Sequence, residues 1–122
     1  MAENITLQIW TPERTAFNQK VYRVVLPTGK TTLTVIEDRA PTSMMIYAGL
    51  MQILNPDDSI KDWYFIDKGV ADIAQNMCRI STAHLLHHSQ ITIDKALELK
   101  EKEPENAVFY NMIVLYLQAF AG

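Results

Sequence analysis

Residues 11–41 read TPERTAFNQKVYRVVLPTGKTTLTVIEDRAP, and this stretch decides the predicted fold of the chain. The runs VYRVVLPT and TTLTVI are rich in apolar and β-branched residues, and a short polar turn joins them. Proline cannot donate a hydrogen bond to a sheet, so Pro12, Pro27 and Pro41 mark the corners. The stretch therefore predicts short β-strands separated by tight turns.

The flanking sequence continues this pattern. Ile5, Leu7 and Ile9 alternate with polar residues, which predicts a half-buried strand. One strand is predicted within residues 21–26, and the others lie at residues 32–35, 43–47, 50–54, 63–66, 70–73 and 77–81. Turn signals recur about every 8 to 12 residues, which is typical of an all-β sandwich or barrel.

The periodicity changes after His88. Within residues 92–102, Ile93 and Ala96 share one helical face, and Pro104 stands where a second helix would begin. Residues 106–122 are apolar on most sides, so this second helix must be covered by the sandwich or by a partner. Its expected packing residues are Phe109, Met112, Ile113, Tyr116 and Phe120. We predict a mainly β chain with an α-helical tail: a β-sandwich domain at residues 1–88, then a short helical hairpin at residues 89–122.

Composition limits the possible functions. The chain has 122 residues, 48% of them apolar, and a net charge of −3, so it can bury a core, and the net charge disfavours nucleic acid as a partner. A single cysteine, Cys78, excludes an internal disulfide and fits a reducing compartment. The first residues, MAENIT, do not resemble a signal peptide, and no apolar run is long enough to span a membrane.

The histidine run is the clearest candidate for a metal site. On a helix, His84, His87 and His88 would share one face and could bind zinc. No cysteine lies nearby, and Asp94 is the next carboxylate along the chain. We therefore interpret the run as a polar stretch where the sandwich meets the tail, and predict no metal.

Other charged clusters favour structural roles. Glu13 and Arg14 are expected to shape a corner through an exposed ion pair rather than to act as a catalytic pair. Asp57, Asp58 and Asp62 lack the closing glutamate of a calcium loop, so a solvated turn is expected. The chain has only four glycines and no glycine-rich phosphate loop. We predict no catalytic residue and no cofactor.

The order of the segments resembles the epsilon subunit of F-type ATP synthases, which is called delta in mitochondria. In that family a strand is followed by T-P-E-R-x-x-F, V-x-x-V-x-L-P-T, a turn and G-H-A-P, and residues 11–41 are similar to this series. Downstream, AGLMQI resembles the family's P-G-x-L-x-I, FIDKGVADI resembles S-G-G-x-x-E-V, and NMCRIST resembles N-x-V-T-V-L-A. The resemblance covers residues 5–83.

The resemblance implies a flattened β-sandwich followed by a helical hairpin. It also implies a non-catalytic rotor subunit of the central stalk, which joins the gamma subunit to the membrane c-ring and couples ion-driven rotation to ATP synthesis. Such a subunit lies on the cytoplasmic face of a bacterial inner membrane, or the matrix face of an organelle membrane, only as part of the complex.

Positions can be carried over from the family's c-ring contacts. The resemblance implies two contact turns, made of Gly29, Lys30 and Thr31, and of Glu37, Asp38 and Arg39. The second turn departs from the family, which has P-G-H there. An outer sandwich face bearing Val21 and Val25 is expected to remain exposed for gamma.

The family's hairpin also begins with a weak nucleotide motif, I/L-D-x-x-R-A. Ile93 and Asp94 match this motif, but Leu97 stands at the arginine position and Lys95 is a poor substitute, so no useful ATP binding is expected. Residues 104–122 contain no lysine or arginine, and the hairpin is short, so we expect it to stay packed rather than inhibit the enzyme.

Two other functions fit the sequence. The chain could be a β-sandwich adaptor that binds another protein through its apolar C-terminal helix. It could also be a small metal-dependent enzyme that uses the histidine run.

Overall fold

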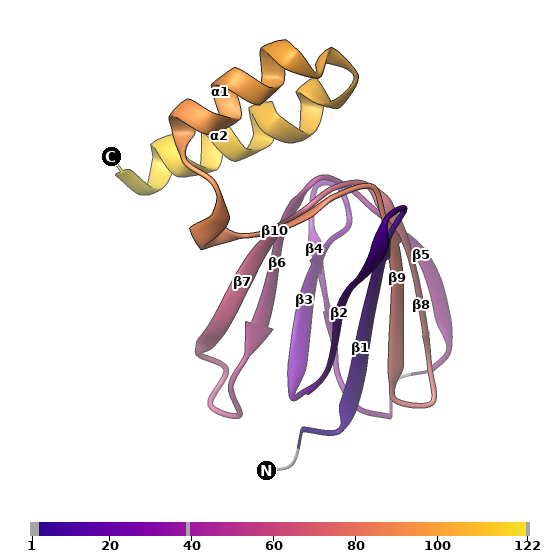
Figure 1. Cartoon of the computed structure of the whole chain (residues 1–122). Helices are drawn as coiled ribbons and strands as arrows, with labels where there is room; N and C mark the ends of the chain where they lie inside the picture. Colours follow the sequence, from indigo (N-terminus) through magenta and orange to yellow (C-terminus); the bar gives the residue numbers. More distant parts are fainter. Residues whose placement is uncertain (1–2, 39, 122) are drawn as a thin grey trace.

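The computed structural model describes residues 3–38 and 40–121, which form two packed sheets and a helical hairpin over one end of them (Figure 1). The first strand of the chain begins at the end of the sandwich opposite the helices (Figure 1). The predicted class, a β-sandwich followed by two packed C-terminal helices, is confirmed.

Among the described residues, each sheet has five strands. Across the first sheet the order is β2 (Arg14–Val21), β1 (Ile5–Thr11), β9 (Met77–Thr82), β8 (Gly69–Ala74) and β5 (Thr42–Ile46). Across the second sheet it is β10 (Leu85–His87), β7 (Ile60–Ile66), β6 (Gly49–Leu54), β3 (Arg23–Pro27) and β4 (Thr32–Val35). Strands β1 and β9 pair in parallel, and the other strand pairs of the described residues are antiparallel.

Apolar side chains at every second position of the strands fill the space between the two sheets. In β1, the side chains of Ile5, Leu7 and Ile9 are buried, and those between them are half-buried. Residues of the facing sheet, including Val24 and Leu26 of β3, close the same core. Successive residues of a strand point to opposite faces, so one face of each strand supplies this core.

Two strands differ from the sequence-based expectation. Residues 14–21 form β2, which pairs with β1, and a break at Tyr22 separates β2 from β3. We had predicted one strand within residues 21–26, because the polar residues at 18–20 hide the apolar alternation of β2. Strand β10 is also unpredicted, because it has only three residues.

The hairpin contains α1 (Ile93–Lys102), a 3-10 turn η2 (Pro104–Asn106) and α2 (Ala107–Ala121). Thr92 caps α1 through its side chain, which accepts a hydrogen bond from the Lys95 backbone N–H at 3.2 Å. A second apolar cluster joins the helices to Phe65 on the outer face of the second sheet. Among the described helices, none is both long and apolar enough to cross a bilayer.

Candidate functional site

A row of exposed apolar side chains crosses the outer face of the first sheet. Met45 pairs with Val70, Val70 with Ser81, and Ser81 with Trp10, so these residues of four neighbouring strands stand in register. Met45 is 65% exposed, Val70 48% and Trp10 37%. We call Met45, Val70 and Trp10 the apolar row.

The neighbouring row on the same face is polar. Two residues further along each strand, the register aligns Ser43, Asp72, Arg79, Gln8 and Asn18. The Ser43 hydroxyl donates to the Asp72 carboxylate at 2.5 Å. The outer face therefore combines an apolar strip with a polar border, which is the usual pattern of a protein-binding surface.

The expected apolar face at Val21 and Val25 does not form. Val21 ends β2 in the first sheet and is buried in the core, whereas Val25 lies in β3 of the second sheet and is half-buried. The two side chains therefore belong to different sheets. The apolar row presents exposed apolar side chains on the outer face of the first sheet instead.

The two predicted c-ring turns lie at opposite ends of β4, the edge strand of the second sheet. Gly29, Lys30 and Thr31 join β3 to β4 and border a surface hollow shared with Tyr116 of α2. Gly29 has φ of 105°, a conformation that favours glycine. The structure thus places this turn next to the hairpin.

The second turn lies near the start of β1. Glu37 accepts a hydrogen bond from the Asn4 side chain at 2.6 Å, and the Asp38 backbone N–H donates to Asn76 at 2.6 Å. Arg39, the last residue predicted for this turn, lies outside the described residues. The structure therefore aligns the two turns along one sheet edge and does not gather them into one loop cluster.

The five predicted hairpin-packing residues lie in different environments. Phe109 and Ile113 are fully buried, and Met112 is half-buried against the same cluster. Tyr116 and Phe120 are 37% and 56% exposed, and the Phe120 ring meets the edge of Trp63 with centroids 5.4 Å apart. The outer side of α2 also exposes Val108 and Leu115.

A buried polar group connects the sandwich to the hairpin. The Asp67 carboxylate accepts the Lys68 backbone N–H at 2.7 Å and lies 2.8 Å from Nδ1 of His84. Thr82 donates its hydroxyl to the Asp67 backbone carbonyl at 2.8 Å. The His84 ring is thereby held in the loop between β9 and β10, where it faces α2.

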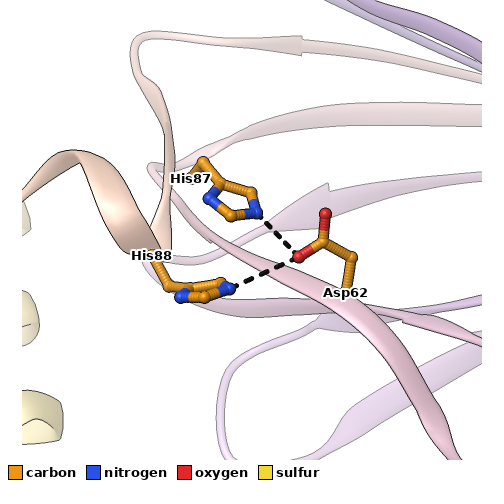
Figure 2. Close-up of side chains that lie close together, drawn as sticks. All are labelled: Asp62, His87 and His88. Carbon is orange, nitrogen blue, oxygen red and sulfur yellow. Dashed lines mark hydrogen bonds and ion pairs between the residues drawn. The ribbon is translucent and has the colours of Figure 1, made fainter.

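The other two histidines converge on a different carboxylate (Figure 2). Nε2 of His87 lies 2.7 Å from Oδ1 of Asp62, and Nε2 of His88 lies 3.4 Å from the same oxygen. Burial alone would raise the pKa of Asp62, but hydrogen bonds from His87 and the Trp63 backbone N–H, together with the histidine charges, hold it below its usual value. Asp62 is therefore a carboxylate at neutral pH.

The helical face that His84, His87 and His88 would share on a helix does not form. His84 precedes β10, His87 ends it, and His88 begins a 3-10 turn, η1 (His88–Gln90). The side chain of His84 therefore lies apart from those of His87 and His88. Sequence reasoning missed Asp62 as their partner, because pairing of β10 with β7 brings them together.

The other charged clusters have modest structural roles. Among the ion pairs of the described residues, none joins Glu13 to Arg14, so the corner prediction is wrong in this detail. The corner is closed by the Thr11 hydroxyl, which donates to the Arg14 carbonyl at 3.3 Å. Asp58 pairs with Arg23 at 3.0 Å on the surface.

The nucleotide-like motif lies at the start of α1. Asp94 is exposed in the first turn, Ile93 is half-buried in the hairpin cluster, and Leu97 is 44% exposed. An apolar side chain thus occupies the surface position where a cation would meet phosphate.

Comparisons with known proteins give one consistent family. Residues 4–87 match the family model of the ATP synthase delta/epsilon chain, β-sandwich domain. The ATP synthase epsilon chain of Rhizobium etli strain CIAT 652 is 27% identical over 113 residues, which cover 90% of this chain and 83% of the relative.

Solved structures show the same fold. A chain in the mitochondrial ATP synthase of Euglena gracilis (OSCP/F1/c-ring) aligns with a TM-score of 0.74 and 17% identity, covering 100% of this chain and 84% of that one. A chain in the central stalk/c-ring structure of the Tetrahymena thermophila mitochondrial enzyme aligns with a TM-score of 0.58 and 14% identity, covering 90% and 96%.

Proposed function

We infer the role of this chain from its family: the chain belongs to the delta/epsilon chains of ATP synthase. It is an epsilon-type, non-catalytic subunit of the central stalk. We propose that it joins the gamma subunit to the c-ring, so that ion-driven rotation of the ring is coupled to ATP synthesis. The observation that carries this proposal is the family match across residues 4–87, which spans the whole sandwich.

The apolar row is the proposed contact surface for gamma. Three large apolar side chains lie exposed in register on a rigid sheet, and a polar row borders them. Burying apolar surface contributes roughly 25 cal/mol per Å², so covering Met45, Val70 and Trp10 would stabilise a complex.

Co-expression with gamma from the same organism tests this assignment. We expect a stable pair that dissociates when Met45 and Val70 are both replaced by glutamate, because the charges would be buried at the interface. Asn18→Glu is the matched control, since Asn18 lies in the polar row of the same sheet. If the wild-type proteins are folded and do not associate, the stalk role is wrong. If the double variant still binds, only the surface assignment is wrong.

The edge strand β4 is the proposed side that faces the c-ring. Gly29, Lys30 and Thr31 lie at one end of this edge, and the turn with Glu37 and Asp38 lies at the other; Arg39 completes that turn in the sequence. The first turn is basic and the described part of the second is acidic, so the charges would orient the subunit more than tighten its binding.

Cysteine crosslinking in the assembled enzyme tests whether the β4 edge faces the c-ring. Lys30→Cys and Asp38→Cys should both crosslink to cysteines in the polar loops of the c-ring. Ser59→Cys is the control, because the β6–β7 turn lies elsewhere on the second sheet. The native Cys78 is buried and should not interfere. Crosslinking through Ser59→Cys alone would contradict the proposal.

An adaptor role is the second candidate, and the exposed apolar side of α2 favours it. Val108 and Leu115 are 78% and 59% exposed, which suits a protein partner. Purification of the native complex separates the two roles, because ATP synthase subunits co-purify under the first and an unrelated partner under the second. In the stalk role, the chain is attached to the membrane only through the complex, on the cytoplasmic or matrix face.

A further inference from the structure

We propose that Asp62, His87 and His88 form a binding site for a divalent transition metal such as Zn²⁺, at the junction of the sandwich and the helical hairpin. Figure 2 shows the two imidazole rings and the carboxylate turned toward one another. One ligand atom from each residue lies within 4.8 Å of the other two. This site is independent of the stalk role.

The ligand set suits zinc chemistry. Two imidazoles and one carboxylate form a set of three protein ligands of a kind that zinc uses, with one coordination position left open. Magnesium and calcium prefer sets of oxygen atoms, which this site lacks. The three side chains are 26–36% exposed, so an ion can reach them and a water molecule can complete the tetrahedron.

The spacing requires only a small adjustment. Zinc–ligand bonds of about 2.1 Å place neighbouring ligand atoms about 3.4 Å apart in a tetrahedron. Nε2 of His88 is already 3.4 Å from Oδ1 of Asp62, whereas Nε2 of His87 is 2.7 Å from it and would have to move outward. A small rotation of the His87 ring would bring this pair of ligand atoms to the tetrahedral spacing.

Neighbouring groups hold the three ligands in place. The His88 ring stacks on Trp63 with centroids 4.5 Å apart and an interplanar angle of 10°. The His87 ring meets Tyr64 edge-on, and its Nδ1 lies 2.7 Å from the Ser89 hydroxyl. Outer contacts of this kind fix the orientation of metal ligands and their tautomer.

Metal binding would change one of these hydrogen bonds. Nδ1 of His87 now also accepts the Ser89 backbone N–H at 3.2 Å. Coordination through Nε2 places the proton on Nδ1, which then donates to the Ser89 hydroxyl and releases that N–H. Two contacts stay in place: the Gln90 side chain accepts the His87 backbone N–H at 2.7 Å, and Asp62 accepts the Trp63 N–H at 2.9 Å.

The ion would link β7 to the segment that leads into the hairpin. Asp62 lies on β7, whereas His87 and His88 lie five or six residues before Ile93, where α1 begins. A ligand that binds only the folded state stabilises it. Zinc should therefore raise the melting temperature of the chain.

Titration of the full chain, purified without a histidine tag and stripped with EDTA, tests the site. We expect saturable binding of one Zn²⁺ per chain by calorimetry, and a tetrahedral absorption band with Co²⁺. His87→Gln and His88→Gln should each weaken binding by about tenfold or more. His84→Gln is the matched control, because it removes a histidine of the same run that binds Asp67 instead.

Three results would overturn the proposal. They are no saturable zinc binding by the folded wild-type chain, binding that is unchanged in His87→Gln and His88→Gln, and an equal loss of binding in His84→Gln. Circular dichroism identifies variants that do not fold. The Co²⁺ titration of the wild-type chain does not depend on any variant. Absence of the tetrahedral band would therefore overturn the proposal even if the variants did not fold.

Discussion

The imidazole ring of His84 lies stacked on the phenyl ring of Phe109, with centroids 5.2 Å apart and an interplanar angle of 16°. His84 belongs to the sandwich and is held by Asp67, whereas Phe109 belongs to α2 and is fully buried. This contact attaches the hairpin to the sandwich at a fixed position.

Replacing Phe109 with alanine should remove that attachment. The lost burial and the remaining cavity should lower the free energy of unfolding by about 3–5 kcal/mol. Urea denaturation followed by circular dichroism measures the change. Val108→Ala, the adjacent and 78% exposed position, is the control and should change stability by about 0.5 kcal/mol or less. Equal effects of the two changes would contradict the packing argument.

Gly69→Ala should destabilise the first sheet. A Cβ atom at Gly69 would overlap the backbone carbonyl of Ser81, so β8 and β9 would have to separate there. Overpacking of this kind costs about 1–3 kcal/mol. Thermal unfolding should show a lower melting temperature. Val70→Ala, the next residue and an exposed one, should have little effect, and an unchanged melting temperature in Gly69→Ala would show that the strands can adjust.

Burial raises the pKa of the Cys78 thiol to about 12. At pH 8 only about one folded chain in ten thousand would carry the thiolate, so a disulfide reagent should react very slowly until the chain is unfolded in urea. Because the folded pKa lies above the ordinary thiol pKa of 9.0, the thiol's contribution to stability is complete below pH 9. This contribution is lost as the pH rises from 9 toward 12.

Cys78→Ala provides the control for this pH dependence. The variant should lose less stability than the wild type between pH 9 and pH 11, measured by urea denaturation at each pH. Rapid labelling of the native wild-type thiol at pH 8 would show that Cys78 is accessible.

The isolated chain should not bind ATP usefully. The apolar Leu97 stands where the related motif has arginine, so the side chain that would pair with phosphate is absent. Calorimetry at millimolar ATP should give no saturable heat. Saturable binding that is weakened by Asp94→Ala would show that the inference is wrong.

Removing residues 104–122 should not raise the rate of ATP hydrolysis by the assembled enzyme. This segment has no lysine or arginine with which to hold an acidic partner, and Phe109 and Ile113 bury it against the rest of the chain. We expect poor assembly, or an unchanged rate of ATP hydrolysis by the assembled enzyme. A several-fold rise in hydrolysis with assembly and coupling intact would falsify this expectation.

The sandwich could be predicted because its buried strands carry a clear period of two. Ile5, Leu7 and Ile9 indicate β1 without ambiguity, and prolines mark the corners. Strand β2 could not be found in this way, since Asn18, Gln19 and Lys20 are exposed on an edge strand and interrupt the pattern. Its position depends on pairing with β1, which is a tertiary property.

The surfaces were harder to predict than the core. Met44 and Met45 are both apolar, so alternation alone does not say which faces the core; the structure buries Met44 partly and exposes Met45. Asp62 meets His87 only because β10 pairs with β7, and 25 residues separate them in the sequence. The residues next to Asp62 and His87 in the sequence give no indication of that contact.

The parallel pairing of β1 with β9 has a consequence for synthesis on the ribosome. Strand β1 emerges before β9, and one of its two edges finds its partner only after residues 77–82 have left the exit tunnel. Until then the nascent chain carries an open strand edge, which can pair with another chain. Chaperones that shield emerging β-strands should therefore matter for the yield of this subunit more than its small size suggests.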